Sequence, residues 1–87
     1  MTKYPESYMG HFGLGEVYLS QEKFQEAISE FERAIKLSEG PGISNTHYYL
    51  GVAFLGSGDR QSARKEYEIL KKRNPELAER LGGEMKK

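Results

Sequence analysis

The chain repeats the segment LGEVYL (residues 14–19) as LGVAFL (residues 50–55). It also repeats AISEF (residues 27–31) as ARKEY (residues 63–67), and both pairs stand 36 residues apart. A leucine–glycine pair, an aromatic residue, an alanine and a second aromatic residue therefore return at the same spacing. A repeat of this length indicates stacked supersecondary units.

Apolar residues around the first copy follow the period of a helix. The pattern predicts one helix over about residues 5–20, with Pro5 in its first turn. A polar break follows, and a second helix is expected over about residues 23–38. Its apolar stripe recurs at intervals of three and one residues and consists of Phe24, Ala27, Ile28, Phe31, Ala34 and Ile35.

The second copy predicts two further helices and a short fifth one. The third helix is expected to start near Ser44 or Asn45, which are good N-caps, and to stop at the glycines of residues 56–58. Asp59 is the predicted N-cap of the fourth helix. Asn74 and Pro75 then predict a fifth helix over about residues 75–82, ended by Gly82 and Gly83. The sequence shows no strand pattern.

Small residues in the repeated segments predict close contacts between helices. We expect Gly15 to lie opposite Ala27, and Gly51 opposite Ala63, so that the backbones approach closely. Aromatic residues would fill the space beside these contacts: Tyr18, Phe31, Phe54 and Tyr67.

Together these residues resemble the tetratricopeptide repeat (TPR) family, whose 34-residue unit spaces a Leu-Gly, an aromatic, an Ala, a second aromatic, a small residue and a Pro. The first unit matches at Leu14, Gly15, Tyr18, Phe24, Ala27, Phe31 and Ala34. The second matches at Leu50, Gly51, Phe54, Ala63, Tyr67 and Pro75, with the turn Gly58-Asp59.

The resemblance implies an all-α fold of antiparallel helix-turn-helix repeats that form a short right-handed superhelical solenoid. It implies one domain over residues 1–87, with repeats at about 8–41 and 44–77 and a capping helix at about 75–82. The chain departs from the family at His11 and His47, where a Trp is usual, and at Leu70, where a small residue is usual. We expect Leu70 to push the capping helix outward.

In this family the first helix of each unit lines a concave surface. The resemblance therefore implies a protein–protein interaction adaptor that binds a peptide or helix in the groove. The peptide-binding residues would be Met9, Phe12, Glu16, Leu19, Asn45, Tyr48, Val52 and Leu55. Phe12 and Tyr48 are the expected hot spots, although Tyr48 is also expected to pack against Phe12. The Lys and Asn with which one TPR subtype grips chaperone tails are missing, so we expect no binding of those acidic C-termini.

Homo-oligomerisation is the alternative function, in which the groove or the first helix packs on another copy of the chain. Two repeats and a cap are fewer than the three repeats that a solenoid usually needs for stability. The first helix has no preceding neighbour, which leaves Tyr4, Tyr8 and Phe12 open to contact with another copy. A homodimer, with exchange across the hinge at residues 40–42, would cover them.

Composition argues against several other classes of protein. Thirteen basic and thirteen acidic residues give zero formal net charge, which disfavours a nucleic-acid partner and gives no general attraction to an anionic membrane. Cysteine is absent, and no apolar run is long enough to span a bilayer. No apolar core of a secretory signal appears near the N-terminus, so we expect a cytoplasmic location.

Motifs of catalysis are missing as well, and we predict that the chain is not an enzyme and needs no cofactor. His11 and His47 occupy equivalent positions in the two repeats, and with Glu16 they offer a conceivable zinc site. The preferred interpretation is that both histidines replace a packing Trp and hold no metal.

Overall fold

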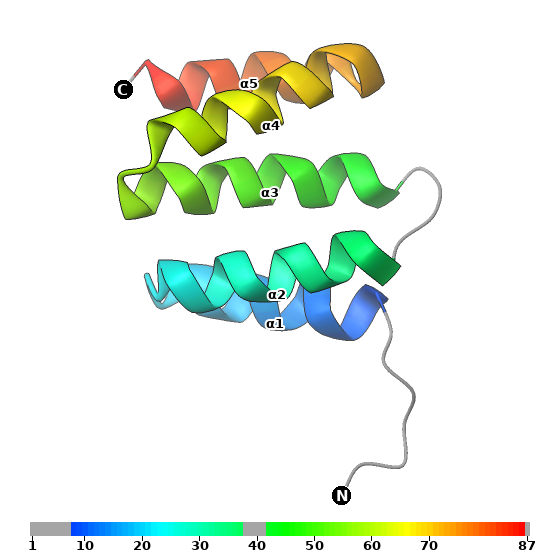
Figure 1. Cartoon of the computed structure of the whole chain (residues 1–87), viewed down its shortest axis with the longest axis vertical. Coiled ribbons are helices and arrows are strands. Elements are labelled where there is room, and N and C mark those ends of the chain that lie inside the picture. The colour runs from blue at the N-terminus through cyan, green and yellow to red at the C-terminus, as the bar shows by residue number, and fades with distance from the viewer. Residues whose placement is uncertain (1–7, 38–41, 87) are drawn as a thin grey trace, which may run out of the picture.

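The computed structural model describes residues 8–37 and 42–86, and the described residues form five helices without a strand. In chain order these are α1 (Tyr8–Ser20), α2 (Phe24–Leu37), α3 (Gly42–Ser57), α4 (Arg60–Arg73) and α5 (Pro75–Met85). Each helix runs antiparallel to the next, with α1 and α2 at one end of the stack, α3 in the middle, and α4 and α5 at the other end (Figure 1). The predicted all-α fold is confirmed.

The start of α3 differs from the prediction. Its described part begins at Gly42, so Ser44 and Asn45 lie inside the helix and the prediction that either caps it was wrong. A contact distant in sequence holds this first turn instead. The hydroxyl of Tyr8 on α1 donates to the carbonyl oxygen of Gly42 at 2.8 Å, and Thr46 Oγ1 donates to the Tyr8 hydroxyl at 2.8 Å.

The N-caps of α4 and α5 lie where the sequence predicts them. The Asp59 carboxylate accepts from the backbone N–H of Ser62 at 3.1 Å and from the Ser62 hydroxyl at 2.7 Å. These hydrogen bonds, the side-chain one first, hold the pKa of Asp59 below its usual value. In α5, Asn74 Oδ1 accepts from the N–H of Leu77 at 3.2 Å, and Pro75 occupies the first helical position.

The end of α5 lies beyond the predicted one. Gly82 and Gly83 do not stop the helix, which runs to Met85. Each glycine costs roughly 1 kcal/mol of helix propensity relative to alanine, but packing on both sides of the pair outweighs it. Leu81 is fully buried, Met85 packs against the same cluster, and the Arg60 guanidinium donates to the carbonyl oxygen of Met85.

The same backbone turn ends the first helix of each repeat. After α1, the N–H of Lys23 bonds the carbonyl of Tyr18 and the N–H of Glu22 bonds that of Leu19. After α3, Asp59 and Gly58 bond the carbonyls of residues 54 and 55 in the same way. This arrangement is a Schellman motif, which needs a left-handed residue. Glu22 (φ 61°) fills that position in the first repeat, and Gly58 (φ 89°) fills it in the second.

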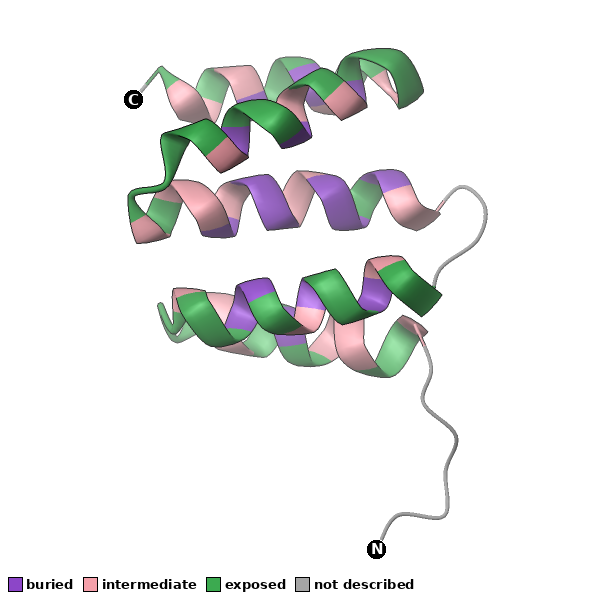
Figure 2. Ribbon diagram, viewed as in Figure 1, coloured by how far each residue is buried: buried purple, intermediate pink, exposed green. Residues whose placement is uncertain are grey.

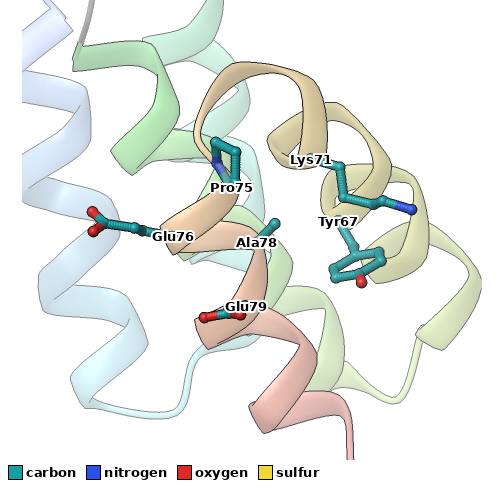
Figure 3. Close-up of a pocket in the computed structure, with 6 residues that line it drawn as sticks. All are labelled: Tyr67, Lys71, Pro75, Glu76, Ala78 and Glu79. Carbon is teal, nitrogen blue, oxygen red and sulfur yellow. The ribbon is translucent and has the colours of Figure 1, made fainter.

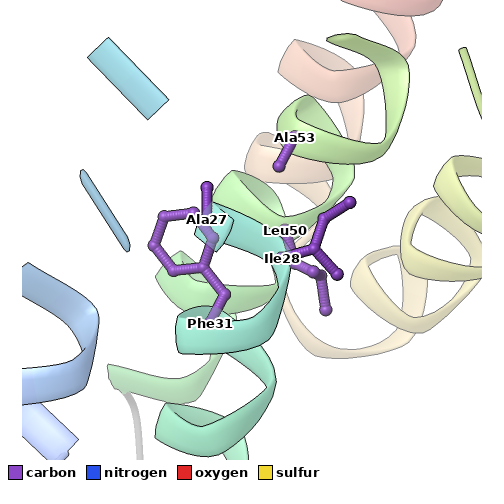
Figure 4. Packing of buried hydrophobic residues seen from close by; sticks show 5 residues of the cluster. All are labelled: Ala27, Ile28, Phe31, Leu50 and Ala53. Atoms are coloured by element: carbon purple, nitrogen blue, oxygen red, sulfur yellow. The ribbon is translucent and has the colours of Figure 1, made fainter. Parts of the chain in front are cut away.

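The first core cluster joins α2 to α3 and is formed by Ala27, Ile28, Phe31, Leu50 and Ala53 (Figure 4). Phe31 is fully buried at its centre, with its ring centroid 5.8 Å from that of Phe12 on α1 and 6.1 Å from that of Tyr49 on α3. Of the predicted packing aromatics, Tyr18 and Phe54 lie half-buried against this cluster. The cluster therefore connects both repeats.

Glycines make room for large side chains here, not chiefly for alanines. A Cβ on Gly15 would lie 2.5 Å from the Phe31 ring, and a Cβ on Gly51 would lie 2.6 Å from a methyl carbon of Leu81. Ala27 and Ala63 are fully buried as expected, but the predicted Gly–Ala contacts are not the closest ones. Because these two positions are glycines, the Phe31 ring of α2 and the Leu81 side chain of α5 can pack directly against the helix backbone.

A second core cluster attaches α5 to the rest of the stack. Leu70, Ala78 and Leu81 are its buried members, and Tyr67 is one of the half-buried residues packed against it. Helix α3 has six buried residues and α1 has one, Gly15. Figure 2 shows this difference in burial between the two helices. The middle helix is thus covered from both sides, and the first helix is covered from one.

The packing of Phe31 against Gly15 predicts that alanine substitutions at two glycines of α1 change the stability of the chain in opposite directions. Gly15→Ala is expected to lower the free energy of unfolding by about 1–2 kcal/mol, because overpacking against the buried ring exceeds the gain in helix propensity. At Gly13 an added Cβ would meet no described atom of another helix within 4 Å, so Gly13→Ala should raise that free energy by up to ~1 kcal/mol. Urea denaturation measures both, and changes of the same sign would contradict the packing described.

The two Schellman turns predict a second pair of opposite effects. Glu22→Gly is expected to stabilise the chain by about 0.5–1 kcal/mol, because glycine adopts the left-handed conformation without the Cβ clash. Gly58→Ala should destabilise it by about 1 kcal/mol for the same reason. Thermal and urea unfolding test this, and a Glu22→Gly variant less stable than wild type would show that the turn is held differently.

Candidate functional site

A histidine and a glutamate form the same pair in both repeats. His11 Nδ1 on α1 lies 2.7 Å from Glu30 Oε1 on α2, and His47 Nδ1 on α3 lies 2.6 Å from Glu66 Oε1 on α4. The pairs are shielded from solvent, since the side chains of the first are 15% and 21% exposed and those of the second 10% and 11%. Each pair ties the two helices of one repeat together.

Sequence reasoning expected the histidines to be packing residues and missed their partners. The signal was present, because Glu30 and Glu66 stand 36 residues apart, as do His11 and His47. Both histidines therefore meet a glutamate 19 residues further along. An ionisable pair repeated at the period of the fold indicates a structural contact.

The zinc alternative gains no support from this geometry. Glu16 is exposed, and Glu30 and Glu66 are the carboxylates that contact the histidines at Nδ1. Within residues 8–37 and 42–86, no group of three His, Asp or Glu side chains is placed to hold a metal ion.

The predicted groove residues of α1 separate into exposed and packed positions. Met9 and Glu16 are exposed, whereas Phe12 and Leu19 are half-buried against the first cluster. Phe12 stacks on Tyr8 at 5.7 Å and meets the edge of Tyr49 at 5.5 Å, measured between ring centroids. Phe12 is thus a packing residue first.

The predicted groove residues of α3 separate in the same way. Asn45 is exposed, and Tyr48, Val52 and Leu55 are half-buried against the second cluster, which includes α5. The ring of Tyr48 lies 5.3 Å from that of Tyr49, its neighbour in sequence. The C-terminal helix therefore covers part of the surface that the sequence assigned to a ligand.

A hollow of about 590 Å³ remains between the first turns of α3 and α5. Its lining is mostly polar and consists of Asn45, Asn74, Glu76, Leu77, Glu79 and Arg80. It offers side-chain amides, two carboxylates and a guanidinium, which can hydrogen-bond the polar groups of a peptide. Asn45 is the one predicted groove residue in this lining.

A second hollow, of about 360 Å³, lies between α4 and α5 (Figure 3). Tyr67 and Lys71 form the α4 side, with Lys71 Nζ 5.6 Å from the centroid of the Tyr67 ring. The Glu76 carboxylate points away from that ring (Figure 3). Nothing in this lining pairs a nucleophile with a general base.

Exposed apolar residues gather on α1. Met9 is 68% exposed, Leu14 47% and Val17 50%, and Leu37 on α2 is 41% exposed. The sequence predicts Met9 as a groove residue and Leu14 as part of the repeated motif, and it assigns Val17 to no site. Coverage of α1 by another copy, the alternative given by the sequence, stays a prediction.

No helix in the described part of the chain combines the length and the apolarity needed to cross a membrane.

The second His–Glu pair predicts a loss of stability that depends on hydrogen bonding. Glu66→Ala is expected to lower the free energy of unfolding by about 1–3 kcal/mol, since it leaves the buried His47 ring without its acceptor. Glu66→Gln should cost less, because its amide oxygen can still accept. Urea denaturation compares the two, and equal losses would show that the pair acts through packing alone.

Comparisons with known proteins agree with the repeat. Residues 8–41 match one tetratricopeptide repeat model, and residues 46–76 match a second one. No curated protein sequence and no solved structure matches the chain. The two matched segments contain both copies of the Leu-Gly motif and both His–Glu pairs. The chain therefore belongs to the tetratricopeptide repeat family, whose helical repeats mediate protein–protein interactions.

Proposed function

We propose that this chain is a non-catalytic interaction module that binds a peptide segment of another protein on the face shared by α1, α3 and α5. The proposal is supported by the family, whose repeats bind proteins, and by the polar hollow at Asn45. The hollow is the observation that carries the proposal, because it joins a predicted groove residue to an open surface.

The lining of the hollow favours a polar, extended segment. The amide of Asn45 can pair with a peptide backbone, and Arg80 can bond a carboxylate of the ligand through two N–H groups. Glu76 and Glu79 would select a positive charge nearby. A segment with alternating charges therefore fits this lining.

The apolar residues of α3 contribute a fixed edge to this surface. Tyr48, Val52 and Leu55 are held by the second cluster while part of each side chain stays exposed. Side chains that are already ordered lose little conformational freedom when a ligand binds. Their role is to support the ligand beside the hollow.

Peptide selection tests the proposal. A displayed library of linear peptides is selected on the wild-type chain, and affinities of the winners are measured for Asn45→Ala and Arg80→Ala. Both residues are exposed, so the fold is expected to persist, and binding should weaken at least tenfold. Lys72→Ala, an exposed change on α4 outside the hollow, is the matched control. Equal affinity for all three variants, or no enriched peptide, contradicts the proposal.

A further inference from the structure

Equivalent residues of α1 and α3 differ in how far they are exposed. Leu14 and Val17 on α1 correspond, 36 residues on, to Leu50 and Ala53 on α3. Leu14 is 47% exposed and Leu50 is 3% exposed, while Val17 is 50% exposed and Ala53 is fully buried. The chain therefore buries this surface in one repeat and leaves it open in the other.

The surface on α3 is covered by α2 of the same chain. Ala27, Ile28 and Phe31 of α2 form the first core cluster with Leu50 and Ala53 (Figure 4). These three residues lie on the apolar side of an amphipathic helix. An alanine, an aliphatic residue and an aromatic residue at positions i, i+1 and i+4 thus define the kind of helix that fits.

The open surface on α1 has room for the same kind of helix. Gly13 corresponds to Tyr49 in the second repeat, whose ring lies 6.1 Å from that of Phe31. Apart from the chain neighbours of Gly13 and the nearby backbone of α1, no described atom lies within 4 Å of a Cβ built on Gly13. An incoming aromatic side chain can therefore take the space above Gly13 that the Tyr49 ring takes in the second repeat.

A charged residue at the edge of the α2–α3 interface also has equivalent neighbours in the first repeat. Lys36 of α2 lines one hollow together with His47, Leu50 and Glu66. The equivalents of the last three residues in the first repeat are His11, Leu14 and Glu30, 36 positions earlier. A basic residue nine positions after the alanine of an incoming helix, as Lys36 follows Ala27, would line the corresponding hollow together with Glu30.

From this correspondence we infer that the surface of Gly13, Leu14 and Val17 on α1 is a docking site for an amphipathic helix of another protein. The helix carries alanine, an aliphatic residue and an aromatic residue on its apolar side, and a basic residue five positions after the aromatic residue. It lies on α1 as α2 lies on α3. This site is separate from the hollow at Asn45 and extends the stack at its first helix.

The chain's own α2 sequence is the probe for the experiment. A capped synthetic peptide of residues 24–37 is titrated into the isotope-labelled full chain, and amide shifts are followed by NMR. Shifts centred on residues 13, 14 and 17 are expected, with weak affinity because an isolated helix of this length is barely stable in water. A peptide with Ile28 and Phe31 replaced by serine is expected to bind at least tenfold more weakly.

Variants of the full chain distinguish specific docking on α1 from non-specific hydrophobic binding. Leu14→Glu is expected to weaken peptide binding at least tenfold while leaving the thermal unfolding of the chain nearly unchanged, since the side chain is exposed. Leu37→Glu makes the same chemical change on another exposed leucine and should leave binding intact. Because neither variant touches Asn45 or Arg80, selected peptides that bind at the hollow should still bind both.

Three outcomes would overturn the inference. One is the absence of shifts on α1 at millimolar peptide. Another is a set of shifts centred on residues 50 and 53, which would show that the peptide replaces α2 inside the stack. The third is a concentration-dependent dimer, seen by light scattering and abolished by Leu14→Glu, which would assign the surface to a second copy.

Discussion

The structure depends on the place of the Phe31 ring against Gly15. The ring is fully buried, and the absence of a side chain at Gly15 lets it contact the backbone of α1 directly. The same ring packs against Phe12 and Tyr49, so one side chain sets the separation of three helices. The rest of the first cluster closes around it. Protein interiors are close-packed, so a change of even one methylene at this contact affects stability.

The second repeat uses the same device with a different partner. A Cβ on Gly51 would meet Leu81 of α5, whereas Tyr67, the equivalent of Phe31, lies nearest to Gly82. The C-terminal helix thereby buries the predicted groove residues Tyr48, Val52 and Leu55 in part. Its exposed residues Glu76, Glu79 and Arg80 line the hollow beside Asn45. The other end of the stack has no such helix among the described residues, and apolar side chains stand open on α1.

Most of the fold could be predicted from the sequence, because its signals are local or periodic. The helical period located α2, and the Asp59 and Asn74 caps fixed the starts of α4 and α5 to the residue. The errors lay where contacts distant in sequence outweigh local preference. Tyr8 holds the start of α3, and the burial of Leu81 carries α5 through two glycines. The candidate site residues were predicted less accurately than the helices. A repeat pattern shows which positions face inward, but it does not show whether a capping helix covers them. The His–Glu pairs could have been found by comparing the two copies for charged residues.

The equal spacing within each His–Glu pair has an evolutionary consequence. Nineteen residues separate the partners in both repeats, and this interval contains the turn that joins the two helices. An insertion in that turn would rotate one helix against the other and separate the histidine from its glutamate. Length variation among descendants of this chain should therefore accumulate between repeats and not inside them. Each helix pair behaves as a cassette of fixed length, which can be duplicated or exchanged as a block while its internal contacts survive.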